Sequence, residues 1–260
     1  MTFPTPPDRP LAGKRVLVTR TREQAGALAE ALRERGAVPV ELPTIQIVAP
    51  LDWAPVDRAV RALDSYDWLV FSSANAVRYF FERLAGHTGP LHPKIAAVGS
   101  ATARALAERG QEVDVVPGEF VAEAVVAELA RHNIANRRVL VPCAEETRDA
   151  LIAGISALGA SVDRVVVYRT LANGDPEFAR YLFAENPVDI VTLTSSSTGR
   201  SLVALLGADG PQLLQPVVIA SIGPITSATA RELGLHVSIE ASDSTIPGLV
   251  DALERYFRQA

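Results

Sequence analysis

The sequence predicts an α/β protein of two similar lobes, each a parallel sheet covered by helices, with the lobes joined by a two-stranded crossing ladder. Short β-branched runs alternate with stretches of helical spacing, as expected for parallel strands buried on both faces. Much of this pattern occurs twice along the chain. A hydrophobic fraction of 48% over 260 residues provides ample core and exceeds the usual size of one domain.

The first half of the chain shows the alternation in order. Ala25, Leu28 and Leu32 recur at helical spacing, and Gly36 follows where a left-handed residue would end the helix. The same reasoning predicts strands at 14–20, 38–48, 67–71, 94–98 and 113–116, and helices at 24–35, 51–63, 73–84, 101–109 and 122–131.

The second half repeats the first with a period of about 123 residues. The paired segments are Lys14–Val18 with Arg137–Val141, Gly36-Ala37 with Gly159-Ala160, Trp68–Ser73 with Ile190–Ser195, and Val98–Thr102 with Ile222–Thr226. The four offsets agree within two residues, which indicates a duplicated unit. The period is far longer than that of solenoid repeats, so two lobes are expected and not an array.

The repeat permits two divisions of the chain. A tandem division cuts near Asn136. An interdigitated division assigns 1–43 and 172–260 to one lobe and 47–168 to the other, with 43–47 and 165–172 as crossing strands and hinge. The extended, partly polar runs at those crossings favour the interdigitated division, and Pro43 suits an edge or crossing strand.

Composition excludes several classes of partner. The net charge is −5 without a basic block, which argues against nucleic acid, and no apolar run approaches the ~18 residues of a membrane span. The proline-rich residues 1–10 are interpreted as a frayed tail without a signal peptide. Cys143 is the single cysteine, which excludes an intrachain disulfide and fits a reducing cytoplasm.

The sequence also predicts that the protein uses neither a metal nor an organic cofactor. The four histidines show no metal-ligand spacing. Neither glycine-rich phosphate-binding fingerprint is found in the chain.

Five loops between strands and helices carry small hydroxyl residues, and their N–H groups could bind anions in the cleft expected between the lobes. Simple helix capping by Ser and Thr is the alternative explanation. The candidate binding residues in these loops are Arg20, Ser73, Ala74, Asn75, Gly99, Ser100, Thr102, Ser197, Gly223 and Thr226.

Tyr168 breaks the internal symmetry, because it replaces Ile45 in the run DRVVVYRT, which ends at Thr170. A half-buried aromatic on a β surface is the simplest interpretation. A phenol at a junction of lobes could also donate a proton to a leaving group in a closed, dry site.

Together the segments VLVTRTREQAGALAEALRERGA, YDWLVFSSANAV, IAAVGSATARAL, VYRT and IASIGPITSATARELG resemble the uroporphyrinogen-III synthase family. The resemblance covers Lys14 to Phe257 and rests on the order and spacing of the motifs. It implies the interdigitated lobes and a cofactor-free cyclisation of linear hydroxymethylbilane, with loss of water and inversion of ring D through a spiro intermediate. It further implies that Tyr168 is the acid and that Thr102 and Thr226 lie in the two glycine loops. The loop Thr19-Arg20-Thr21 departs from the Thr-Arg-Pro often seen in the family.

We expect a monomer whose partners are its small-molecule substrate and, transiently, the preceding enzyme of the pathway. Two other functions remain open on the residues alone. One is a non-catalytic tetrapyrrole- or anion-sensing module of the same fold, which would lack the tyrosine or carry a DNA-binding region. The other is a two-lobed solute receptor, which would require export.

Overall fold

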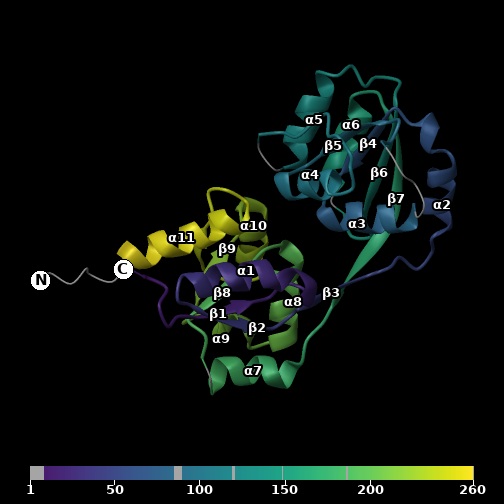
Figure 1. Cartoon of the computed structure of the whole chain (residues 1–260). Helices are drawn as coiled ribbons and strands as arrows, with labels where there is room; N and C mark the ends of the chain where they lie inside the picture. The colour runs from purple at the N-terminus through teal and green to yellow at the C-terminus, as the bar shows by residue number, and fades with distance from the viewer. Residues whose placement is uncertain (1–8, 85–89, 119–120, 148, 186, 260) are drawn as a thin grey trace, which may run out of the picture. The chain divides into compact units, whose positions relative to one another are not determined.

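The computed structural model describes residues 9–84, 90–118, 121–147, 149–185 and 187–259 (Figure 1). The tail prediction for residues 1–8 therefore lies outside the described part. The chain forms two compact units, one running up to Gln46 and resuming at Leu171, the other comprising Ile47–Thr170.

The first unit contains a five-stranded sheet in the order β10-β9-β8-β1-β2, in which every pair of neighbours is parallel. Its strands are β1 (Arg15–Val18), β2 (Val38–Glu41), β8 (Ile190–Leu193), β9 (Val218–Ser221) and β10 (Val237–Glu240). Its helices are α1 (Arg22–Glu34), α7 (Pro176–Ala184), α8 (Ser196–Leu206), α9 (Gly210–Leu213), α10 (Pro224–Glu232) and α11 (Ile246–Gln259).

Strand β1 shows why the sheet needs helices on both faces. Val16 and Val18 pack with residues of α1 and α11, whereas Leu17 points to the opposite face, against α7, α8 and α10. All three side chains are fully buried. Such a strand has no solvent face, which is why its sequence is continuously apolar.

The second unit has the sheet order β3-β7-β6-β4-β5. Its strands are β3 (Ile45–Val48), β4 (Trp68–Phe71), β5 (Lys94–Ala97), β6 (Arg138–Ala144) and β7 (Ser161–Ala172). Its helices are α2 (Ala54–Arg61), α3 (Ala74–Arg83), α4 (Ser100–Ala107), α5 (Ala122–Ala130) and α6 (Ala150–Ala157), with a short 3₁₀ turn at Leu63–Ser65. One core packs under α2, α3 and α4, and the other under α5 and α6.

The boundaries between the units fall inside two neighbouring strands. Gln46 and Ile47 adjoin within β3, and Thr170 and Leu171 adjoin within β7. The two strands are hydrogen-bonded neighbours in the sheet of the second unit. Strands from the beginning and from the end of the chain consequently share the first sheet.

The internal repeat extends to the register of the sheets. Arg15 pairs with Val38 in the first unit, and Arg138 pairs with Ser161 in the second, so both partners are displaced by 123 residues. The αL glycines Gly36 (φ 81°) and Gly159 (φ 85°) end the equivalent helices. Positive φ is costly for any residue with a Cβ, which explains glycine in both copies.

Two predicted elements differ from the structure. Residues 113–116 form no strand and contribute only an isolated bridge between Val115 and Ala96. The predicted run 38–48 is divided into β2 and β3, which belong to different sheets. The interruption contains Pro43, whose nitrogen cannot donate to a ladder.

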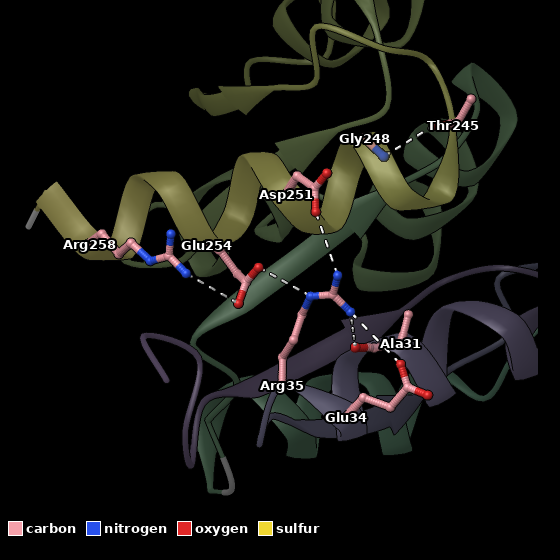
Figure 2. A network of polar contacts seen from close by, with 8 residues as sticks. All are labelled: Ala31, Glu34, Arg35, Thr245, Gly248, Asp251, Glu254 and Arg258. Atoms are coloured by element: carbon pink, nitrogen blue, oxygen red, sulfur yellow. Dashed lines mark hydrogen bonds and ion pairs between the residues drawn. The ribbon is translucent and has the colours of Figure 1, made fainter. Parts of the chain in front are cut away.

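The C-terminal helix is held to α1 by a polar network around Arg35 (Figure 2). The Arg35 guanidinium donates to Glu254 Oε2 at 3.2 Å and to the Ala31 carbonyl at 3.1 Å, and it lies 3.5 Å from Asp251 Oδ1. This network joins segments over 200 positions apart in sequence. No described helix is long and apolar enough to cross a membrane.

Candidate active site

Tyr168 lies on β7 at the level where β6 ends, because it pairs with Ala144, the last residue of that strand. Its side chain is 8% exposed and packs in the core under α3. In parallel sheets this carboxyl edge is where loops lead into helix N-termini and where ligands usually bind.

A β-bulge determines which face Tyr168 occupies. Val166 pairs with Cys143 and Tyr168 with Ala144, so Val167 is an extra residue on β7. Without this one-residue shift, strict alternation would turn Tyr168 to the face opposite α3. Because of the bulge, Val167 and Tyr168 both contribute to the core under α3.

The phenol of Tyr168 contacts Ser73, another predicted site residue. Their oxygens lie 3.1 Å apart, and either hydroxyl could be the donor. Ser73 is the N-cap of α3, and its Oγ also accepts from the Ala76 N–H at 3.1 Å. The site thus links a buried phenol to the positive end of a helix.

Tyr79, six residues after Ser73 on α3, supports the phenol ring. The two rings are stacked, with centroids 6.0 Å apart and planes inclined by 22°. The Tyr79 hydroxyl donates to the Ile47 carbonyl of β3 at 3.0 Å, and the Arg78 guanidinium lies over the Tyr79 ring. These contacts restrict the ring of Tyr168 from one side.

Burial raises the pKa of Tyr168 above that of a free phenol, because the charged form would lose solvation. The hydrogen bond with Ser73 acts in the opposite direction and lowers this pKa, while the nearby Cys143 raises it. The phenol is therefore protonated at neutral pH, as an acid requires.

The other predicted residues of this unit lie at the same sheet edge. Ala74 and Asn75 form the first turn of α3, and Gly99 is the N-cap of α4, which starts at Ser100. Thr102 is buried in the first turn of α4. Strands β4 and β5, which precede these helices, are parallel neighbours, so the two helix N-termini lie next to each other.

The remaining predicted residues belong to the first unit. Arg20 follows β1, Ser197 lies in the first turn of α8, and Gly223 and Thr226 begin α10 after β9. Strands β1, β8 and β9 are consecutive in one parallel sheet, so these residues share its carboxyl edge. The structure thus groups the predicted residues at two sheet edges, one in each unit.

Arg20 is the positive charge of this second group. Its Nη2 donates to Gln24 at 3.3 Å, but its Nε is buried without a hydrogen-bond partner among the described residues. Burial lowers the pKa of Arg20, as expected where the charged form is desolvated. A buried donor of this kind is costly unless a ligand satisfies it.

Two features of the site were not identified from the sequence. Tyr79 lies in the run VRYFFER, where an aromatic at helical spacing is expected to be core. The bulge at Val167 cannot be recognised in the sequence, because Val167 is one of three consecutive valines. The signal for this site in the sequence is the symmetry break at Tyr168.

The chain is similar to known proteins of one family. Residues 26–251 match the family described as "Uroporphyrinogen-III synthase HemD". A protein of Synechococcus elongatus named "Uroporphyrinogen-III synthase" is 36% identical over 261 residues, which cover 97% of this chain and 98% of the relative.

Two solved structures share the fold. A mutant uroporphyrinogen III synthase of the extremely thermophilic bacterium Thermus thermophilus matches with a TM-score of 0.65 at 18% identity, covering 95% of this chain and all of its own. The uroporphyrinogen-III synthetase of Helicobacter pylori matches with a TM-score of 0.61 at 15% identity, covering 94% of this chain and 99% of its own. With the family match over most of its length and a full-length relative at 36% identity, the chain belongs to the uroporphyrinogen-III synthase family.

Proposed function

We propose that Tyr168 is the general acid of uroporphyrinogen-III formation in this protein. The observation that carries this proposal is a buried, protonated phenol at the carboxyl edge of a parallel sheet, 3.1 Å from Ser73. The activity itself follows from family membership and from the name of the full-length relative. It is that of a cyclising lyase in porphyrin and haem biosynthesis.

The reaction begins with the terminal hydroxyl of hydroxymethylbilane. Tyr168 gives its phenolic proton to that oxygen while the carbon–oxygen bond breaks, so water leaves and an azafulvene-type cation forms. Ring D attacks the cation through its substituted carbon to give the spiro intermediate, which reopens and closes with the ring inverted. The pyrrole proton released when the last ring regains aromaticity can return to the phenolate.

The acid needs to lower the activation barrier only modestly, because the bilane also cyclises spontaneously to the uninverted isomer. The protein must chiefly hold the chain so that inversion precedes simple closure, which is control of geometry. A loss of about tenfold on removal of the acid, ~1.4 kcal/mol of barrier, is therefore compatible with its role.

The substrate carries eight carboxylates, and the helix N-termini of both units offer N–H groups to them. We assign this binding role to the loops that contain Ser73, Ala74, Asn75, Gly99, Ser100, Thr102, Ser197, Gly223 and Thr226. Arg20 adds a buried cation whose Nε lacks a partner among the described residues. An approaching carboxylate would satisfy that donor.

The test is an isomer assay on freshly prepared hydroxymethylbilane, with type I and type III uroporphyrin separated after oxidation. The unmodified protein should form type III far above the spontaneous background. Tyr168→Phe should lower the rate of type III formation about tenfold or more without unfolding the protein. Tyr181→Phe is the matched control, since that tyrosine is 49% exposed on α7.

The two failures have different meanings. If the unmodified protein forms no type III above background, the assignment of this activity to the protein is wrong. Full activity in Tyr168→Phe would be consistent with the assigned activity but would exclude Tyr168 as the acid.

We further propose that the enzyme is a cytoplasmic monomer that needs no cofactor and contacts the preceding pathway enzyme transiently. Sedimentation of the purified protein and of its mixture with that enzyme tests the oligomeric state and the transient contact.

A further inference from the structure

We propose that Ser73 is a positioning residue for the acid, and that its hydroxyl donates to the phenol oxygen of Tyr168 and thereby leaves the phenolic proton directed at the substrate. This inference rests on the proposed role of Tyr168. It gives Ser73 a function distinct from holding substrate carboxylates, because its hydroxyl acts through another side chain.

The hydrogen bonds around Ser73 favour this direction. Its Oγ already accepts from the Ala76 N–H, the capping bond of α3. A hydroxyl that accepts such a bond becomes a better donor, since successive hydrogen bonds polarise one another. The Tyr168 oxygen, 3.1 Å away, is an acceptor within reach of this hydroxyl. The chain of donors then runs from Ala76 through Ser73 to Tyr168.

This direction also supports proton transfer. When Tyr168 gives up its proton, the charge that develops on its oxygen is met by the Ser73 hydroxyl and, behind it, by the N-terminus of α3. The opposite direction would point the phenolic proton at Ser73 and away from any substrate. The hydrogen bond with Ser73 lowers the pKa of Tyr168 against the rise caused by burial.

Three other described residues near the phenol do not supply this donor. Tyr79 of α3 stacks on the ring, and its hydroxyl is committed to Ile47. Arg78 lies over the Tyr79 ring. The thiol of Cys143, on β6, raises the pKa of Tyr168. Among these contacts Ser73 is the group that favours the deprotonated phenol.

The internal repeat separates capping from positioning. Ser195 is the counterpart of Ser73 and caps α8, where it accepts from Thr198 in a capping box. The counterpart of Tyr168 in the other copy is Ile45, which has no hydroxyl. The second contact of the Ser195 hydroxyl is local, with Ser197 Oγ of the same helix at 2.9 Å. In the copy that carries the phenol, the second contact instead joins the helix cap to Tyr168 of β7.

Three substitutions at Ser73 distinguish the two roles. Ser73→Thr keeps both the acceptor and the donor, and it should retain kcat within about threefold. Ser73→Asp still caps α3 but cannot donate when ionised, so kcat for type III should fall about tenfold without a comparable loss of thermal stability. Ser73→Ala removes both the cap and the donor, so both thermal stability and kcat should fall. Asp175→Ala, which removes the N-cap of α7, is the control for capping alone.

A readout besides rate comes from the phenol itself. With ¹³Cζ-labelled tyrosine, Tyr168→Phe identifies one resonance among the five tyrosines of the chain. The titration of that resonance should move to higher pH in Ser73→Asp and Ser73→Ala, and should stay in place in Ser73→Thr and Asp175→Ala. Unchanged titration and kcat in Ser73→Asp would overturn the inference and reduce Ser73 to a cap.

The double variants separate this inference from the proposed function. In a Tyr168→Phe background, Ser73→Asp should cause no further loss of kcat, because the two residues act as one unit. A further full tenfold loss would show that Ser73 acts elsewhere. If Tyr168→Phe alone is fully active, the acid role fails, while the titration still reports whether Ser73 donates to the phenol.

Discussion

The ring of Tyr79 stacks on the ring of Tyr168, with centroids 6.0 Å apart, and its hydroxyl is anchored to the Ile47 carbonyl. Aromatic pairs at this separation and inclination are favourable beyond the area they bury. A helix residue fixed to β3 thus holds the acid on β7 in one orientation.

The stack can be tested by two substitutions. Tyr79→Leu removes the aromatic partner, so kcat for type III should fall severalfold while KM changes less, because the acid acts on the bond that breaks and not on substrate binding. Tyr79→Phe keeps the ring and should retain kcat, with a loss of about 1 kcal/mol in the free energy of unfolding from the broken bond to Ile47. Equal kinetics in the two variants would exclude the stack as a positioning element.

A pH-dependent contribution to stability is expected from Tyr66. Its hydroxyl donates to Asp163 Oδ2 at 2.7 Å, and burial, followed by this bond, raises its pKa to about 12. Because the folded pKa lies above the ordinary value of 10, the stabilisation is complete below pH ~10 and is lost as the pH rises toward 12.

Tyr66→Phe should therefore lower the free energy of unfolding by about 1 kcal/mol at pH 7. This loss is small for a hydrogen bond to a charged acceptor, because Asp163 is about half exposed and its charge is screened by solvent. Urea unfolding measured from pH 7 to pH 12 should show the difference from the unmodified protein shrinking above pH 10. Tyr181→Phe provides the exposed control. A difference that stays constant with pH would contradict the assignment of this phenol.

The network around Arg35 should contribute to the stability of α11 (Figure 2). Arg35→Met keeps the aliphatic contacts but removes the bonds to Ala31, Asp251 and Glu254, so a loss of about 1–2 kcal/mol is expected. Hydrogen exchange of α11 peptides, together with urea unfolding, measures this loss.

Arg33→Met is the control for Arg35→Met. Its guanidinium is about half exposed and forms two surface ion pairs, with Glu30 on the same helix at 3.5 Å and with Glu41 of β2 at 3.9 Å. Such a surface pair should cost at most about 0.5 kcal/mol. Similar losses in both variants, or no change in the exchange of α11, would show that the network does not hold the helix.

The sequence predicted the elements well where the pattern is local. Gly36 and Gly159 were expected to end equivalent helices, and both have positive φ. The strand predicted at 113–116 does not form, although the counterpart segment 237–240 forms β10. A β-branched run becomes a strand only if its backbone finds a ladder, and here only Val115 bridges to Ala96.

The candidate site could be predicted by residue type but not by contact. The sequence marks Ser73 as one of several hydroxyls in loops before helices, and Tyr168 as the residue that replaces Ile45 in the repeat. Neither observation placed the two side chains 3.1 Å apart, because β4 and β7 are separated by β6 in the sheet and by about a hundred positions in the chain.

The sequence by itself determined a duplicated α/β chain of the uroporphyrinogen-III synthase family with one tyrosine out of symmetry. Local periodicity and the repeat carry that information, since each depends on residues close in sequence or on comparison of the two copies. Only the tertiary structure decided where the phenol points. The register of β7 against β6 slips by one residue at Val167, and in a strand with alternating side chains a slip of one turns Tyr168 to the face of Ser73.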